Sequence, residues 1–114
     1  MIAVIFEVEP HPDHKDTYLA RAADLRPLFE DLDGFISIER FESIVNPGKL
    51  VSLSFWRDEA AIENWRAFEA HRKAQFAGRN HWFKNYRLRV ASVLRDYSKD
   101  NREEAPADMR AANG

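Results

Sequence analysis

The sequence predicts a single α+β domain of the ferredoxin-like type, a βαββαβ chain whose four strands form one antiparallel sheet. Three observations predict this fold class. Apolar residues alternate in four short segments, they recur at helical spacing in two longer segments, and turn-forming residues separate most of these segments. The 114 residues, 45% of them hydrophobic, suffice for one core and not for two.

The chain begins with a predicted strand and a predicted helix. Residues 2–8 (IAVIFEV) are apolar on both alternating faces, which is typical of a central strand covered on both sides. Asp13 follows a proline and is expected to cap a helix. Pro27 lacks the backbone donor and is expected to kink that helix or to restart it. The helix has an apolar stripe at steps of three and four, comprising Tyr18, Ala22, Leu25, Phe29 and Leu32.

A hairpin is predicted next. Residues 35–42 and 50–56 alternate as strands on either side of the turn sequence Asn46-Pro47-Gly48-Lys49. Ile36 and Ile38 are expected on one face of the first strand. The second strand is expected to carry apolar residues on one face and small polar residues on the other, namely Val51, Leu53 and Phe55 against Ser52 and Ser54.

A second helix and a last strand complete the predicted domain. Asp58 is expected to cap the helix, and Gly78 is expected to stop or bend it. The buried stripe of this helix comprises Ala61, Ile62, Trp65 and Phe68. Residues 85–97 alternate as the last strand, with three arginines on one face. These arginines are expected to form a salt-bridged edge, or a dimer seam with two glutamates: Arg87, Arg89 and Arg95, with Glu39 and Glu42.

The predicted sheet has one face without helices. Both helices of this topology cover the same face, although the first strand is apolar on both faces. A second copy of the chain is the simplest cover, so the sequence predicts a homodimer with a two-fold interface. The domain is expected to span residues 1–97. Residues 98–114 are expected to form a polar tail, which is either disordered or packed on the partner subunit.

The composition of the chain restricts the classes of binding partner and metal site that we expect. The net charge of −2, from 17 basic and 19 acidic residues, argues against a nucleic acid, and the absence of cysteine excludes disulfides and thiolate metal sites. His11 and His14, with Asp13 between them, lack a fourth ligand, so no metal site is expected. The apolar N-terminal segment meets acidic residues within ten positions, which argues against a signal peptide or membrane helix. The lack of cysteine is what a cytoplasmic protein would show.

Several stretches follow a known pattern. They are Asp33-Gly34-Phe35, Ser54-Phe55-Trp56-Arg57-Asp58, Trp65, and the run from His71 to Tyr97, which is built on His71, Arg72, Gln75, Gly78, Arg79, Trp82, Tyr86, Arg89 and Val90. These stretches resemble the antibiotic biosynthesis monooxygenase (ABM) family. The resemblance implies a dimeric α/β barrel with one pocket per subunit, between the sheet and the second helix.

The same resemblance bears on cofactors. Some relatives degrade haem with an Asn on the first strand, a Trp on the second helix and a haem-binding His ten residues later. Trp65 matches that Trp, but Gln75 stands ten residues on and Glu7 lies near the Asn position, so the resemblance does not imply haem breakdown. His71, one turn before Gln75, is the only nearby substitute. Other relatives oxidise aromatic molecules without a cofactor, which implies a monooxygenase that uses molecular oxygen.

Oxidation without a cofactor requires particular side chains, and the sequence offers a candidate for each. A cofactor-free oxygenase converts its substrate into an electron-rich anion, which requires a base, a cation for the oxyanion and a dry apolar slot. His71 is the candidate base, with His81 as the reserve. Arg72 and Arg79 are the candidate cations. The candidate substrate-binding residues, which suit a small phenol-like or quinol-like molecule, are Trp65, Phe68, Gln75, Trp82 and Tyr86.

Each assignment has a structural alternative. His71 can be a surface residue, either catalytic arginine can pair with Glu69 or Asp96, and Trp65 can belong to the helix core. Three functions therefore stay open at this point. The first is the oxygenase, the second is a dimer that binds a small molecule without chemistry, and the third is a haem-binding or haem-degrading protein.

Overall fold

A computed structural model describes residues 1–75 and 82–109, with side chains for residues 1–68 and 82–109. Its elements follow the predicted ferredoxin-like order, with one short 3-10 helix added. They are β1 (Ile2–Pro10), η1 (Pro12–His14), α1 (Lys15–Glu30), β2 (Phe35–Glu42), β3 (Leu50–Trp56), α2 (Glu59–Gln75) and β4 (Phe83–Ser92). None of the helices in these ranges is long and apolar enough to cross a membrane.

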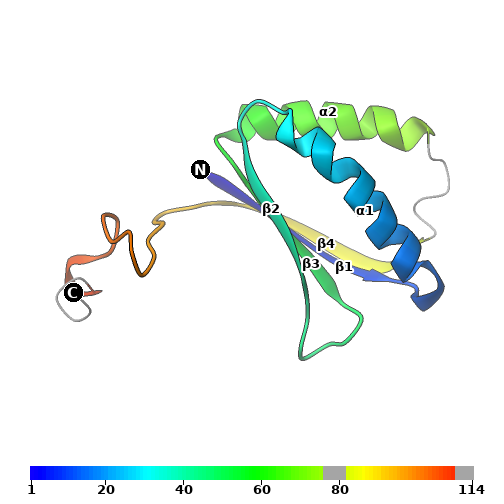
Figure 1. The fold of residues 1–114 in the computed structure, drawn as a ribbon, viewed down its shortest axis with the longest axis horizontal. Coiled ribbons are helices and arrows are strands. Elements are labelled where there is room, and N and C mark those ends of the chain that lie inside the picture. Colours follow the sequence, from blue (N-terminus) through cyan, green and yellow to red (C-terminus); the bar gives the residue numbers. More distant parts are fainter. Residues whose placement is uncertain (76–81, 110–114) are drawn as a thin grey trace.

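The four strands form one antiparallel sheet in the order β2-β3-β1-β4, and both helices lie over the same face (Figure 1). The register aligns Val4 of β1 with Ser54 of β3 and with Val90 of β4. Directly paired residues share a face of the sheet. Even-numbered residues of β1 therefore face the helices, and the odd-numbered Ile5 and Glu7 face away from them.

The core lies between the sheet and the helices. Phe29 of α1, Ile38 of β2 and Trp56 of β3 are buried there, together with Ala61 and Ile62 of α2. Trp56 is only 1% exposed, and its indole N–H donates a hydrogen bond to Ser54 Oγ at 2.9 Å. The small serine face of β3 is thus the face under the helices, because it leaves room for the indole.

The prediction that Ile36 shares a face of β2 with Ile38 is wrong. Phe35 pairs with Trp56, and Ser37 pairs with Phe55, the next residue of β3. Ile36 is therefore an extra, unpaired residue of β2 and forms a bulge. Ile36 is 52% exposed, whereas Ile38 is 7% exposed and Phe35 packs against the core. The extra residue moves Phe35 onto the face of Ile38 and removes Ile36 from it.

Three further expectations are corrected. Asp13 does not cap α1, because the N-cap position is His14 and no side chain caps it. The helix does not restart at Pro27 but continues to Glu30. The last strand begins at Phe83 and ends at Ser92, earlier at both ends than predicted. Asp58, in contrast, caps α2 as predicted, since its carboxylate accepts the Ala61 N–H at 3.0 Å.

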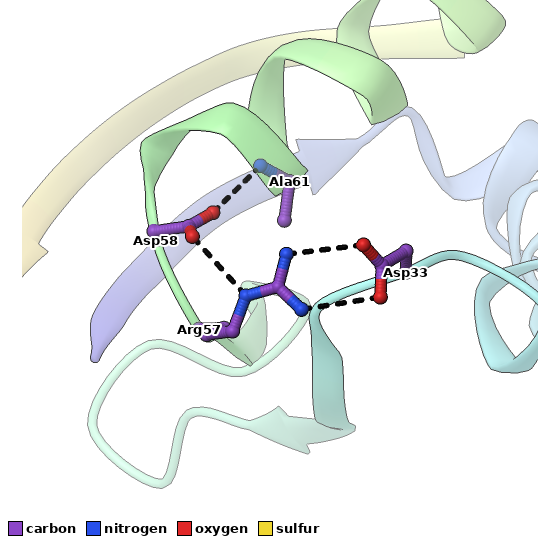
Figure 2. Close-up of polar contacts among 4 residues, drawn as sticks. All are labelled: Asp33, Arg57, Asp58 and Ala61. Atoms are coloured by element: carbon purple, nitrogen blue, oxygen red, sulfur yellow. Dashed lines mark hydrogen bonds and ion pairs between the residues drawn. The ribbon is translucent and has the colours of Figure 1, made fainter.

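Arg57 joins the start of α2 to the start of β2. Its guanidinium donates to both carboxylate oxygens of Asp33 at 3.1 Å and to Asp58 at 3.1 Å (Figure 2). Gly34, beside Asp33, has φ +84°, and a Cβ there would lie 2.6 Å from the Cβ of Ala61. Glycine is required at this position by both its backbone conformation and the closeness of α2.

One arginine of β4, the edge strand of the sheet, forms a salt bridge as predicted, and the alternative of a dimer seam with Glu39 and Glu42 stays a prediction. Arg89 pairs with Glu7 of the neighbouring strand at 2.6 Å, and the same carboxylate also binds Lys49 at 3.1 Å. Glu42 pairs instead with Lys15 of α1 at 2.9 Å. Arg89 is thus paired from the adjacent strand, because the register sets Glu7 directly opposite Arg87 and Arg89 lies two positions farther along the same face of β4.

The chain after β4 leaves the sheet and extends away from it (Figure 1). It is held at its start by the Val93 N–H, which donates to the Met1 carbonyl at 3.0 Å. Farther on, the Arg102 guanidinium lies over the Tyr97 ring at 5.3 Å, and Ala105 is buried. The described part of this segment therefore makes a compact turn of its own.

Candidate functional site

A cavity of about 300 Å³ lies between the helix-covered face of the sheet and both helices. The sheet supplies its floor, mainly through Val4, Phe6 and Ile38, and α1 and α2 supply its roof through residues such as Leu25, Phe29 and Ile62. Its edge is formed by β4, where Tyr86, Leu88 and Val90 line the cavity and are 64%, 54% and 48% exposed. The cavity is of the size and apolar character that small-molecule sites have.

Aromatic rings close one end of this cavity. Phe6 contacts Phe83 and Tyr86, with ring centroids 6.2 and 5.9 Å apart, and Tyr18 of α1 meets Phe83 edge-on at 5.4 Å. Trp82 lines the same end and stacks on His14 of η1 at 6.4 Å. Rings from β1, α1 and β4 thus surround a space in which a flat molecule can stack.

Trp65 has two roles in this structure. Its ring lies 4.0 Å from the ring of Phe29, which is a core residue, and 5.6 Å from the ring of Phe68. It also lines the cavity. The two readings of Trp65 from the sequence, core and pocket wall, are therefore not exclusive, because one face of a large ring can pack while another borders the cavity.

The polar groups of the cavity are few. Its described lining contains two serines and three arginines, Arg21, Arg40 and Arg66, and none of the described lining residues is acidic. Arg66 is 68% exposed and lies 3.9 Å from Glu63. The Nε of Arg40 is buried and has no hydrogen-bond partner among the described residues. Such an unpaired donor costs free energy unless something binds it.

The structure places only some of the predicted site residues. Trp65, Trp82 and Tyr86 line the cavity, and Phe68 packs on Trp65 from one turn later in α2. The structure does not describe the side chains of the remaining candidates. These are His71, Arg72 and Gln75 on the last turns of α2, and Arg79 and His81 in the segment that follows.

Sequence reasoning missed the contribution of β2 and α1 to the site. It placed the pocket between the sheet and the second helix without naming a residue of β2 or α1, whereas Tyr18 and Arg21 of α1 and Arg40 of β2 also line the cavity. The sequence did indicate on which face of its strand Arg40 lies. A residue two positions after a core residue of a strand faces the same side, and Arg40 follows the buried Ile38 in this way.

The described part of the cavity wall offers no histidine to a haem iron, and the side chains of His71 and His81 are outside the described residues. The same described lining contains no Cys or Met, which are other common haem-iron ligands. Glu7, which stands near the position of a haem-contacting Asn in some relatives, faces the opposite side of the sheet. Lys49 and Arg89 hydrogen-bond its carboxylate there and lower its pKa.

The open face of the sheet carries a second, polar hollow. It is lined by charged and polar groups of β1 and β4, together with Lys49: Glu7, Glu9, Asn85, Arg87 and Arg89. Apolar side chains of β1 and β3 lie on the same face, among them Ile5, Leu53 and Phe55, and all three stay partly exposed. This face thus combines uncovered apolar surface with a cluster of ion pairs.

Comparison with known proteins adds family information. The model of the family described as "Antibiotic biosynthesis monooxygenase" matches residues 1–76. A protein of Pyricularia oryzae named "Jasmonate monooxygenase ABM" is 47% identical over 93 residues, which are 82% of this chain and 43% of that protein. The chain therefore spans less than half the length of this relative. "Uncharacterized protein YqjZ" of Bacillus subtilis is 31% identical over 82% of this chain and 79% of its own length.

Solved structures share the fold at lower identity. Rv0793 from Mycobacterium tuberculosis has a TM-score of 0.73 at 23% identity, covering 85% of this chain and 98% of its own. A variant of MhuD with two manganese protoporphyrin IX molecules per active site has a TM-score of 0.69 at 18% identity, covering 86% and 99%. At these identities the likeness shows a common fold.

Proposed function

Because the chain belongs to the antibiotic biosynthesis monooxygenase family, we propose that it is a monooxygenase that oxidises a small aromatic molecule of the phenol or quinol type. The cavity between the sheet and the helices is the proposed site. The observation that carries the proposal is its lining, in which aromatic rings and aliphatic side chains surround a few arginines and hydroxyls. A flat, acidic aromatic molecule matches such a lining in shape and charge.

The proposed reaction stores no cofactor and uses molecular oxygen as co-substrate. Oxygen is a triplet and reacts with an electron-rich carbanion or phenolate far more readily than with a neutral phenol. The substrate then supplies all the electrons: a phenol loses the hydrogen of its hydroxyl and the hydrogen of the para ring carbon, that carbon gains one oxygen atom and becomes the second carbonyl of a quinone, and the other oxygen atom leaves as water. The protein has to remove one proton, stabilise the resulting oxyanion and keep bulk water out.

His71 is the proposed base, and Arg72 and Arg79 are the proposed cations for the oxyanion. All three assignments rest on residue type and on their place on α2 and in the segment after it. The described cavity supports part of the remaining requirement, because its wall is mostly apolar and two helices cover it, while its β4 edge is exposed in the single chain. The Pyricularia oryzae relative is named for jasmonate, a small molecule, which supports a small-molecule substrate here.

We also infer that two copies of the chain pack through their open sheet faces into a shared barrel. Members of the family are commonly dimeric. In this chain Ile5, Leu53 and Phe55 lie on the face without helices and stay partly exposed. Packing that face against a second copy would bury them. The tail after residue 97 is proposed to lie against the partner subunit, since it leaves the sheet of its own chain.

Oxygen uptake tests the proposed function. Purified protein is incubated with a panel of hydroquinones and anthrone-like phenols, without added metal or flavin. We expect uptake that depends on substrate, is lost in His71→Ala and is retained in His11→Ala, a control at an exposed histidine before η1. Equal uptake in His71→Ala would contradict its role as base. Absent uptake, together with saturable quenching of tryptophan fluorescence by a panel member, would favour the dimer that binds without chemistry.

A further inference from the structure

The charged side chains that line the cavity are all of one sign. Arg21, Arg40 and Arg66 are the charged members of its described lining, although the chain as a whole has more acidic than basic residues. The cavity is otherwise mostly apolar. Arg66 lies 3.9 Å from Glu63 and Arg21 also has an interaction partner, so Arg40 is the arginine of this lining that indicates a ligand.

Arg40 differs from three other arginines of the chain, each of which lies within 4 Å of a carboxylate. Arg57 binds Asp33 and Asp58, Arg89 binds Glu7, and Arg66 lies near Glu63. The Nε of Arg40 is instead buried without a hydrogen-bond partner among the described residues. Glu42, two positions along the same face of β2, is already bound to Lys15.

The surroundings of Arg40 show where a partner would sit. The register aligns Arg40 with Ser52 of β3, and Ser52 with Phe6 of β1. All three side chains line the cavity. A guanidinium, a hydroxyl and an aromatic ring thus follow one another across its floor, which places a polar end next to a stacking surface.

We propose that the cavity binds an aromatic or similarly apolar molecule that carries a carboxylate, and that Arg40 binds this carboxylate. The proposal rests on the proposed function for the location of the site, and it adds the chemical class of the ligand. A guanidinium matches the two oxygens of a carboxylate through paired hydrogen bonds. Because the Nε is buried, the carboxylate would pair with the guanidinium after a small rotation of the Arg40 side chain, and the apolar part of the ligand would lie among the aromatic rings.

Isothermal titration calorimetry with a matched pair of probes tests this assignment. The probes are 1-naphthylacetate and its neutral amide, which share one ring system and differ in charge. We expect wild-type protein to bind the carboxylate about tenfold more tightly than the amide, since a hydrogen bond to a charged group is worth roughly that factor or more. Arg40→Met is expected to bring the ratio to about one, and Arg40→Lys to keep part of it because the charge remains.

Arg26→Met is the matched control. Arg26 is exposed on α1 and is not part of the cavity wall, so this variant has the same change in net charge and should keep the full preference for the carboxylate. Thermal unfolding checks that each variant is folded. Arg40→Met should unfold at the wild-type temperature or above it, because the substitution removes a buried donor that has no partner.

Three results would overturn the proposal. They are equal affinities of the wild type for both probes, an unchanged ratio in folded Arg40→Met, and no binding of the carboxylate at millimolar concentration. The assay measures binding and no turnover, so its outcome is separate from that of oxygen uptake. The protein could prefer the carboxylate through Arg40 and yet consume no oxygen. This result would support the carboxylate site and contradict the proposed oxygenase function.

Discussion

Arg57 donates two parallel hydrogen bonds to the carboxylate of Asp33, which lies 24 positions earlier in the chain, and both are 3.1 Å long. The pair connects the loop before β2 to the loop before α2 (Figure 2). The Arg57 backbone N–H also donates to the Gly34 carbonyl at 2.7 Å. This junction holds the first turn of α2 over the core, and α2 contributes Ile62 and Trp65 to the cavity.

The first prediction concerns pH. The hydrogen bonds from Arg57 lower the pKa of Asp33 below its ordinary value. A carboxyl whose pKa is lower in the folded state stabilises the protein above its unfolded pKa, about 3.9, and loses this contribution as the pH falls through the folded pKa. Asp33→Asn should therefore lower the unfolding temperature at pH 7, and the difference from wild type should shrink towards pH 2.

Circular dichroism melts between pH 2 and pH 7 measure this effect. Asp24→Asn, at an exposed carboxylate of α1, is the matched control and should follow the wild type across the range. A difference between Asp33→Asn and wild type that stays constant with pH would contradict the role of the ion pair.

The second prediction compares two glycines with positive φ. At Gly34 an added Cβ would lie 2.6 Å from the Cβ of Ala61, whereas at Gly48 nothing lies within 4 Å. Gly34→Ala should cost about 2–5 kcal/mol, from backbone strain and overpacking together, and Gly48→Ala about 1 kcal/mol from strain alone. Urea unfolding of both variants gives the two values. Equal costs would show that α2 can move away from Gly34.

The third prediction concerns the buried hydrogen bond between Trp56 and Ser54. Ser54→Ala leaves the indole N–H without its partner at a site where Trp56 is 1% exposed, which should cost about 1–3 kcal/mol. Combined with Trp56→Phe, the same Ser54→Ala change should cost less, because no donor remains to be satisfied. A double-mutant cycle by guanidinium unfolding measures the coupling. Additive costs would contradict it.

The fourth prediction tests the proposed dimer. Leu53 lies on the open face of β3, opposite Ile5, so Leu53→Glu places a charge in the inferred interface. Light scattering after size exclusion should show a dimer for wild type and a monomer for this variant, since burying an unpaired charge is costly. Ala23→Glu, on the exposed side of α1, should stay dimeric. A Leu53→Glu dimer would place the interface elsewhere.

The sequence by itself determined the order of the elements and several of their ends. The cap at Asp58 and the stripe that contains Ile62 and Trp65 could be predicted because they depend on residues a few positions apart. The turn at residues 46–49 was predictable for the same reason, and the Lys49 N–H donates to the Asn46 carbonyl there at 3.0 Å. Local spacing and capping chemistry suffice for such features.

Only the tertiary structure decided which side chains meet across the sheet. The bulge that exposes Ile36 and the pairing of Arg89 with Glu7, 82 positions apart, depend on strand register. The burial of Arg40 Nε beside the cavity depends on the helices that cover β2. A shift of one residue in register moves a side chain to the other face, and no local pattern specifies that register. The sequence therefore predicted some aromatic residues of the site, namely Trp65, Trp82 and Tyr86, and the face of Arg40 could be inferred from its spacing after Ile38, but the burial of its Nε could not.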